Sequence, residues 1–169
     1  MKRTIALAAA AAALLSVSAG AATIVGAAQQ AGDFTKLLAA GKLIGVDKTL
    51  NGKGPFTLFA PNDAAFAKVP PAKLDMMMKP ANREMLKTVM GAHLLTGLLS
   101  MQAIDQGLAK EPAVAATTVN NMPLVFKREG GMLTVNGAKI VKPPMRVDNG
   151  IVYVIDTVLV PPMPLQPTY

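Results

Sequence analysis

The chain has 169 residues, a formal net charge of +7, no cysteine, no tryptophan and two tyrosines. The lack of cysteine excludes disulfides and thiol chemistry, so that burial alone must stabilise the fold. The few aromatic residues and the dispersed basic residues, with no run longer than Lys127-Arg128, argue against nucleic-acid binding.

The first 21 residues have the pattern of a secretory signal peptide. Lys2-Arg3 gives a positive start, residues 5–17 an apolar stretch and residues 19–21 a small-residue cleavage pattern. No cysteine stands at this site, which argues against a lipoprotein anchor. We therefore expect an exported protein, periplasmic or secreted to the cell surface, with no transmembrane segment in the mature chain.

Cleavage after Ala21 would leave about 148 residues, the size of one ordinary domain. It would also lower the formal charge to +5, since 15 basic residues then face 10 acidic ones. We interpret residues 22–31 as a short linker before the domain.

The first predicted elements are two short helices. Asp33 is a candidate N-cap for a helix that ends at Gly41, and a second helix continues through Leu50.

The stretch GPFTLFAPNDAAFAKVP, residues 54–70, predicts a strand, a turn and a helix. In the strand, alternation places Phe56, Leu58 and Ala60 on one face and Thr57 and Phe59 on the other. The turn follows at residues 60–63. Asn62 can then cap a short helix that carries Phe66 and ends at Pro70-Pro71.

Residues 72–97 predict two helices separated at Lys79-Pro80. The second carries an apolar stripe that ends in a histidine, with Leu86, Val89, Met90 and His93 at i, i+3, i+4 and i+7. Ser100 is placed to cap a further helix.

From Pro112 onward the pattern changes to strands. Three pairs suit tight hairpin turns, because Gly and Asn tolerate a positive φ: Gly130-Gly131, Asn136-Gly137 and Asn149-Gly150. A helix-rich first half and an antiparallel second half predict an α+β fold. Residues 163–169 form a Pro-rich tail.

These segments resemble the fasciclin (FAS1) domain family. NGKGPFTLFAPNDAAFAKVP is similar to its first signature motif, LTVNGAKIVKPPMRVDNGIVYVIDTVLVPP to its second, and VMGAHLLTG to its central Tyr-His segment. The chain departs from the family at Ala92, where Tyr is common, and at Tyr153, where many members have His. The resemblance covers residues 32–162 and implies one domain, an antiparallel β-sandwich or wedge flanked by several short helices.

The resemblance implies that the polar motif residues build the scaffold. The residues that it assigns to structure are Phe56, Thr57, Phe59, Pro61, Asn62, Asp63, Phe66, His93, Asn149, Gly150 and Asp156.

Reactive groups are few in the predicted mature chain. Ser100 is its only serine and His93 its only histidine, seven residues apart, and Ser100 already suits a helix cap. One His and no Cys are too few ligands for zinc, and no acidic loop typical of calcium sites occurs. We therefore expect no enzymatic activity, no metal site and no cofactor, and we interpret His93 as a core histidine bonded to a neighbouring turn.

Methionine is unusually frequent, with eleven in the chain. Three interpretations remain open. Methionines can fill irregular gaps in a core, or they can line a pliable apolar groove between helices 72–95 and the sheet. The candidate groove residues are Met76, Met77, Met78, Met85 and Met90. The third interpretation is copper(I) binding by Met76 and Met78.

Two functions from different classes follow. The first is a non-enzymatic binding module for cell-surface or matrix adhesion, with an extracellular protein or polysaccharide as its partner, as the resemblance implies. The alternative is a carrier of an apolar small molecule, a carotenoid or a lipid, in the methionine-lined groove.

Overall fold

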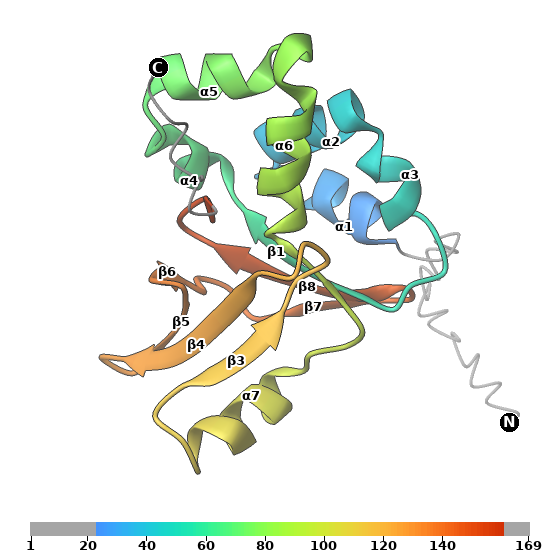
Figure 1. The fold of residues 1–169 in the computed structure, drawn as a ribbon. Helices are drawn as coiled ribbons and strands as arrows, with labels where there is room; N and C mark the ends of the chain where they lie inside the picture. The colour runs from blue at the N-terminus through green and yellow to red at the C-terminus, as the bar shows by residue number, and fades with distance from the viewer. Residues whose placement is uncertain (1–22, 161–169) are drawn as a thin grey trace, which may run out of the picture.

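The computed structural model describes residues 23–160. The predicted signal peptide, residues 1–21, and the predicted tail, residues 163–169, lie outside the described residues. The fold is α+β, with helices mainly in the first half and strands mainly in the second (Figure 1), which confirms the predicted class. No described helix has both the length and the hydropathy needed to span a membrane.

Most of the helices lie together on one side of the strands, and the last helix lies on the other side (Figure 1). The helices are α1 (Ile24–Ala31), α2 (Thr35–Ile44), α3 (Val46–Leu50), α4 (Asp63–Ala67), α5 (Pro71–Met78), the 3₁₀ turn η1 (Pro80–Asn82), α6 (Arg83–Gly91) and α7 (Met101–Leu108). The strands are β1 (Phe56–Pro61), β2 (Leu94–Thr96), β3 (Val114–Thr117), β4 (Pro123–Glu129), β5 (Met132–Val135), β6 (Ala138–Lys139), β7 (Met145–Val147) and β8 (Gly150–Ile155).

The strands form two four-stranded sheets. Sheet A has the order β2-β1-β8-β7 and sheet B the order β3-β4-β5-β6. All pairs are antiparallel except β1 with β8, which run parallel from Phe56 opposite Gly150 to Pro61 opposite Ile155. A single bridge between Ile140 and Ile155 joins the sheets.

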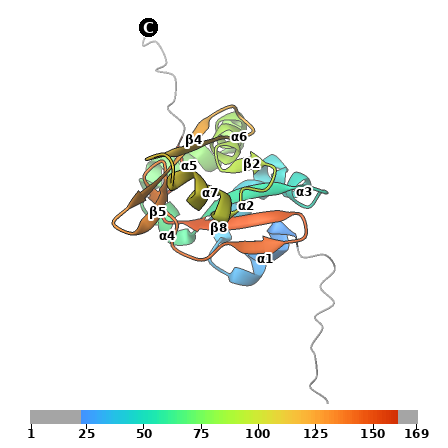
Figure 2. The ribbon, with the colours of Figure 1, turned by 90° about the horizontal axis from the view of Figure 1, so that it is seen from below.

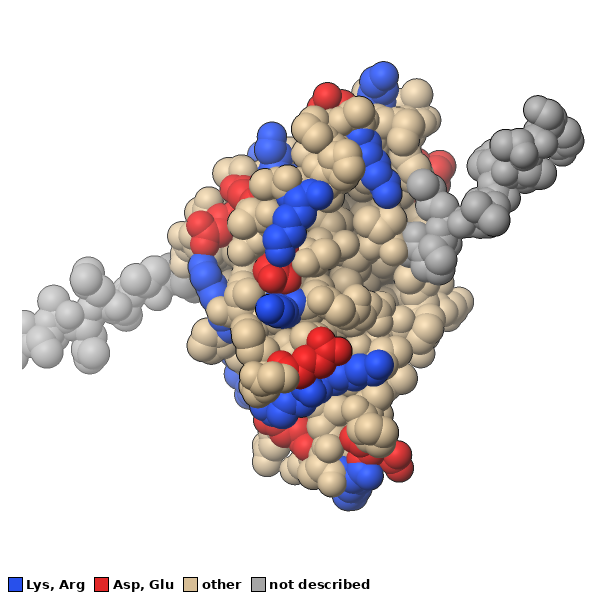
Figure 3. Space-filling model, turned by 90° about the vertical axis from the view of Figure 1, so that its left-hand side faces the viewer, with Lys and Arg blue, Asp and Glu red and all other residues tan. Residues whose placement is uncertain are grey.

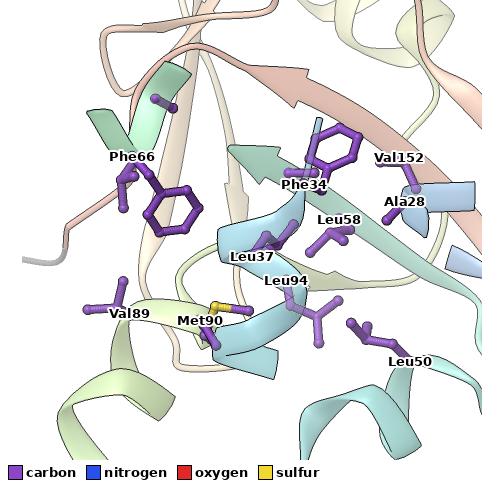
Figure 4. Close-up of a cluster of buried hydrophobic side chains, with 14 of the residues drawn as sticks. Ala28, Phe34, Leu37, Leu50, Leu58, Phe66, Val89, Met90, Leu94 and Val152 are labelled. Carbon is purple, nitrogen blue, oxygen red and sulfur yellow. The ribbon is translucent and has the colours of Figure 1, made fainter. Parts of the chain in front are cut away.

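Sheet A separates two hydrophobic clusters. The helical cluster lies between this sheet and helices α1 to α6 (Figure 4) and includes Leu58 and Ala60 of β1. The sandwich cluster lies between the two sheets and α7, and includes Phe59. Figure 2 shows β8 between α1 on one side and α7 on the other. The alternation predicted for β1 is confirmed.

The linker predicted for residues 22–31 is wrong over Ile24–Ala31, which form α1. The hydroxyl of Thr23 accepts a hydrogen bond from the Gly26 amide and caps this helix. Ile24 and Ala28 are buried in the helical cluster. The helix is therefore held by one narrow apolar face. Because most residues around this face are small, no clear apolar stripe in the sequence predicts the helix.

The start and the end of α2 also differ from the prediction. Asp33 does not cap it, because its carboxylate pairs with Lys142 at 2.6 Å. The cap comes instead from α4, where Asp63 accepts hydrogen bonds from the Lys36 amide at 3.1 Å and the Thr35 hydroxyl at 2.7 Å. The helix passes through Gly41 and ends at Gly45, whose φ is +72°.

Electrostatics agree with this capping role of Asp63. Partial burial raises the pKa of the Asp63 carboxyl, but the hydrogen bonds from Lys36 and Thr35 outweigh burial and hold it below its usual value. The native state thus favours the ionised carboxylate.

The β7–β8 hairpin turns one residue earlier than predicted. Asp148 and Asn149 form the turn, and Gly150 already belongs to β8, opposite Val147. Gly150 is needed for close approach, because a Cβ atom there would lie 2.0 Å from the Phe56 carbonyl oxygen. The other two turns have the positive φ values expected, with Gly130-Gly131 and Asn136-Gly137 in the left-handed region.

Replacing Asp63 by alanine should lower the free energy of unfolding by about 1–2 kcal/mol, because two donors at the start of α2 lose their acceptor. Urea unfolding at pH 7 measures this. Asp75→Ala removes an exposed carboxylate of α5 and should change stability by less than about 0.5 kcal/mol. Equal effects of the two changes would contradict the capping role.

Gly150→Ala should cost about 3 kcal/mol, because the added methyl group meets the backbone of β1 rather than a movable side chain. Gly26→Ala is the matched control. Its Cβ would lie 3.4 Å from the Thr23 hydroxyl oxygen, and the change should stay within about 1 kcal/mol. Thermal unfolding compares the two, and a fully stable Gly150→Ala protein would show that the β1–β8 contact is looser than described.

Candidate functional site

His93 lies between the two clusters and is 1 % exposed. Its Nε2 accepts a hydrogen bond from the Leu159 amide at 2.9 Å, so its Nδ1 carries the proton and donates to the Val89 carbonyl at 2.7 Å. Burial disfavours the charged ring and lowers its pKa from 6.5 to about 4. The ring is neutral at pH 7, and backbone groups occupy both of its nitrogens.

Thr57 and Tyr153 hold the segment that follows β2. The Thr57 hydroxyl donates to the Gly97 carbonyl at 2.7 Å and accepts from the Leu99 amide at 2.9 Å. The Tyr153 hydroxyl donates to the Leu99 carbonyl at 2.6 Å, and burial raises its pKa to about 12. Its ring stacks on Phe59, with centroids 5.2 Å apart. Tyr153, a departure from the family pattern, thus anchors this segment.

Asn149 connects three separate parts of the chain. Its Oδ1 accepts from the Ile24 amide at 3.1 Å, and its Nδ2 donates to the Leu50 carbonyl at 2.5 Å and the Gly52 carbonyl at 3.0 Å. The side chain is 8 % exposed. It therefore ties α1 and the end of α3 to the β7–β8 turn.

Asp156 plays a similar part at the other end of β8. It accepts hydrogen bonds from the Lys139 amide at 2.9 Å and the Thr157 hydroxyl at 3.1 Å, and Lys68 lies 3.3 Å away. Partial burial raises its pKa, but these bonds and the Lys68 charge leave it below the usual value. The carboxylate joins β6 to the end of β8.

The remaining motif residues are also parts of the scaffold. Asn62 accepts a hydrogen bond from the Ala65 amide at 2.8 Å and caps α4. Phe66 is buried in the helical cluster, Phe56 packs against it, and Pro61 ends β1.

The groups considered for catalysis are bound to backbone. The Ser100 hydroxyl accepts from the Ala103 amide at 3.1 Å and caps α7, while His93 is enclosed. Within residues 23–160, no three His, Asp or Glu side chains gather in a way that could hold a metal ion. The described residues thus contain no assembled triad or metal centre.

One recess of the described structure is a groove of about 410 Å³, which we call the α6–β2 groove. The α2–α3 junction, β1, the end of α6, β2 and the turn 118–121 enclose it. It is lined by Ile44, Gly45, Val46, Thr49, Leu50, Phe56, Leu58, Lys87, Met90, Gly91, Leu94, Thr96, Val119 and Asn120. Lys87 is the one charged residue of this lining, and it pairs with Glu84 at 2.7 Å.

The turn 118–121 forms the wall that sequence reasoning missed. The side-chain Nδ2 of Asn120 donates to the Thr88 carbonyl at 2.9 Å, and the backbone amide of Val119 donates to the Leu94 carbonyl at 3.0 Å. Val119 is 42 % exposed at the rim. The Asn120-Asn121 pair signals a turn, but nothing in the sequence indicates that this turn docks on α6.

The five methionines predicted to line a groove differ in their surroundings. Met90 lines the α6–β2 groove, but Met77 is buried in the helical cluster, and Met78 and Met85 pack against that cluster. Met76 is 42 % exposed. The physical reason is that α5 turns Met77 toward the other helices. Met76 and Met78, the predicted copper(I) pair, lie in different environments.

The charged surface is mixed in sign. On the face shown in Figure 3, Lys and Arg side chains alternate with Asp and Glu side chains. Such a surface agrees with solvated charges rather than with a single-sign binding patch.

The buried His93 makes stability depend on pH. Because its pKa falls from 6.5 to about 4 on folding, the native state binds fewer protons than the unfolded chain between these values. The stability that depends on the neutral His93 ring is fully present above pH 6.5 and is lost as the pH falls toward 4. Between pH 7.5 and 5 the free energy of unfolding should decrease by about 2 kcal/mol.

Urea unfolding at both pH values measures the decrease, and His93→Gln serves as the comparison. This variant should be less stable at pH 7.5, and its stability should change little between the two values. A variant that shows the same decrease as the unchanged protein would rule out His93 as its cause.

Comparison with known proteins was made for sequence and for structure. The model of the fasciclin domain family matches residues 32–161. Protein sll1483 of Synechocystis is 32 % identical over 141 residues, which are 83 % of this chain and 74 % of that protein. The cell surface glycolipoprotein MPB83 of Mycobacterium bovis is 35 % identical over 114 residues, 68 % of this chain and 47 % of that protein.

A larger relative contains the match as a small part of its length. The transforming growth factor-beta-induced protein ig-h3 of Sus scrofa is 32 % identical over 129 residues, 76 % of this chain but 18 % of that protein.

A solved structure shows the same fold. It is a FAS1 domain pair from the insect cell adhesion molecule fasciclin I, with a TM-score of 0.73 and 20 % identity, and the match covers 82 % of this chain and 51 % of that one. At this identity the likeness concerns the fold alone. The family match over most of the chain confirms the resemblance of the sequence motifs, and the chain belongs to the fasciclin domain family.

Proposed function

We propose that this protein is a non-enzymatic binding module, exported to the periplasm or the cell surface, that attaches to an extracellular protein or polysaccharide. The observation that carries the proposal is the use of the motif's polar side chains. Thr57, His93 and Asn149 are buried and hydrogen-bonded to the domain's own backbone. Groups committed in this way hold a shape and are not free for chemistry.

The relatives support the cell-surface part of the proposal. MPB83 is named a cell surface glycolipoprotein, and this chain covers about half of it, so the partners of the whole relative are not transferred. The predicted signal peptide agrees with export.

We assign partner contact to the α6–β2 groove. The groove is largely apolar, and its rim combines exposed Val119 and Thr96 with Lys87. The ion pair of Lys87 with Glu84 is exposed and contributes little, so Lys87 can turn to an acidic group of a partner at small cost. An apolar recess with polar groups at its rim is the usual anatomy of a protein contact site.

A second candidate is binding of an apolar small molecule, a carotenoid or lipid, in the same groove. Its volume of about 410 Å³ lies in the range of small-molecule sites, and Met90 at its floor is adaptable. This candidate needs one methionine and not the five that the sequence suggested.

The decisive comparison is binding of labelled protein to intact cells of its source and to their isolated envelope. Val119→Asp should weaken saturable binding about tenfold, because it places a carboxylate at the rim of an apolar groove that the partner would cover. Val141→Asp is the matched control, since Val141 is 40 % exposed and does not line the groove. It should bind like the unchanged protein.

The same preparations separate the two candidates. An apolar mass or a visible absorption band that accompanies the purified protein and is lost in Val119→Asp would favour the small molecule. Absence of saturable binding to both cells and envelope would refute the attachment function, and equal weakening by both variants would refute the groove as its site.

A further inference from the structure

Strand β3 forms one edge of sheet B, with β4 on its only paired side (Figure 1). Its hydrogen-bond pattern follows from the Thr118 amide, which donates to the Met122 carbonyl. Antiparallel pairing alternates, so Val114 and Ala116 bond to β4. The N–H and C=O groups of the alternate residues, Ala115 and Thr117, therefore point away from the sheet, and those of Ala113 continue the same row.

These outward groups have no hydrogen-bond partner within residues 23–160. The side chains of Ala115 and Thr117 are exposed, and those of Val114 and Ala116 pack against the sandwich cluster. Helix α7 also packs against that inner face, where Ile104 joins the cluster. The edge of β3 is thus a straight row of donors and acceptors beside small side chains.

The other three sheet edges in the described part of the chain are protected. Strand β2 has three residues, and the Val119 amide occupies its Leu94 carbonyl. Strand β6 has two residues, one of them Lys139, and β7 follows Pro143-Pro144 and carries Arg146. Short length, proline and charge are the devices that keep sheet edges from pairing.

Strand β3, with four residues, is longer than each of these three strands and has neither proline nor charge. Residues 113–122 contain no charged residue and no proline. The described residues elsewhere carry a net charge of +5, from 15 basic and 10 acidic side chains, which repels a second copy. The uncharged edge is where two copies can approach with least repulsion.

We propose that β3 pairs antiparallel with β3 of a second copy, about a two-fold axis at Ala115. This register places Ala115 opposite its own counterpart and Ala113 opposite Thr117 of the partner subunit. It uses all the outward groups of the edge and joins two four-stranded sheets into one continuous sheet. An isologous contact of this kind closes on itself and stops at the dimer.

The inference goes beyond the proposed binding function and does not rest on it. Pairing of five-residue edges buries less surface than the roughly 1,200 Å² of stable complexes, so the dimer is transient and depends on concentration. It would present two α6–β2 grooves on one particle, which favours attachment to arrays of partners.

Cysteine cross-linking tests the register, and the chain has no cysteine of its own. In the proposed pair, the two Cα atoms of Ala115→Cys lie about 5.5 Å apart, within reach of a disulfide. Those of Thr117→Cys lie about 14 Å apart, four residues out of register and beyond reach. Ala72→Cys, exposed on α5, reports random collision.

Under mild oxidation of purified protein, Ala115→Cys should give disulfide-linked dimer several times faster than Thr117→Cys and Ala72→Cys. Equal rates for the three variants would overturn the proposal. So would faster cross-linking of Thr117→Cys than of Ala115→Cys.

Sedimentation equilibrium tests the association without a cross-link. The mean mass of the unchanged protein should rise with concentration. Ala115→Lys should abolish the rise by placing two like charges together, while Ala72→Lys, with the same added charge, should retain it. A monomer at every concentration, or a dimer that survives Ala115→Lys, would refute the edge pairing, whatever the outcome of the cell-binding experiment.

Discussion

The parallel pairing of β1 with β8 is the contact on which the rest of the structure depends. It brings residues 56–61 beside residues 150–155, which are far apart in the sequence. Every residue of β8 is buried, and both faces of this strand pair carry a hydrophobic cluster. Parallel strands are typically covered on both faces, and here helices α1 to α6 cover one face while sheet B and α7 cover the other. The first signature motif of the sequence contains β1 and the second contains β8.

The polar residues around this strand pair connect it to neighbouring segments of the chain through hydrogen bonds. Asn149 joins the start of β8 to α1 and α3, His93 bonds the end of α6 to the segment after β8, and Tyr153 holds the segment after β2. Each satisfies backbone groups that burial would otherwise leave unpaired at a cost of about 1–3 kcal/mol. The two contacts proposed above, at the α6–β2 groove and the edge of β3, lie on the surface and leave these buried bonds intact.

The sequence predicts those features of the fold that are determined by residues close together in the chain. The two faces of β1, the caps Asn62 and Ser100 and the break at Lys79-Pro80 were evident from alternation, capping residues and proline. Errors arose where a distant partner decides the outcome. Asp33 and Asp63 look alike as capping residues, and only the contact of α4 with α2 makes Asp63 the cap. Gly150 suggested a turn, but the reason for it is the backbone of β1 across the sheet. The groove was missed because its wall, Val119 and Asn120, docks on α6 from far along the chain.

The central claim, that the motif's polar residues are structural, is tested most directly at His93, the only histidine of the chain. A nitrogen-15 NMR titration of its imidazole in the native protein reports both the tautomer and the pKa. The account predicts a neutral ring protonated at Nδ1, unchanged from pH 7.5 to pH 5, with a pKa of about 4. A ring that titrates near 6.5, or that exchanges its proton between the two nitrogens, would show that His93 is accessible and would contradict the structural role.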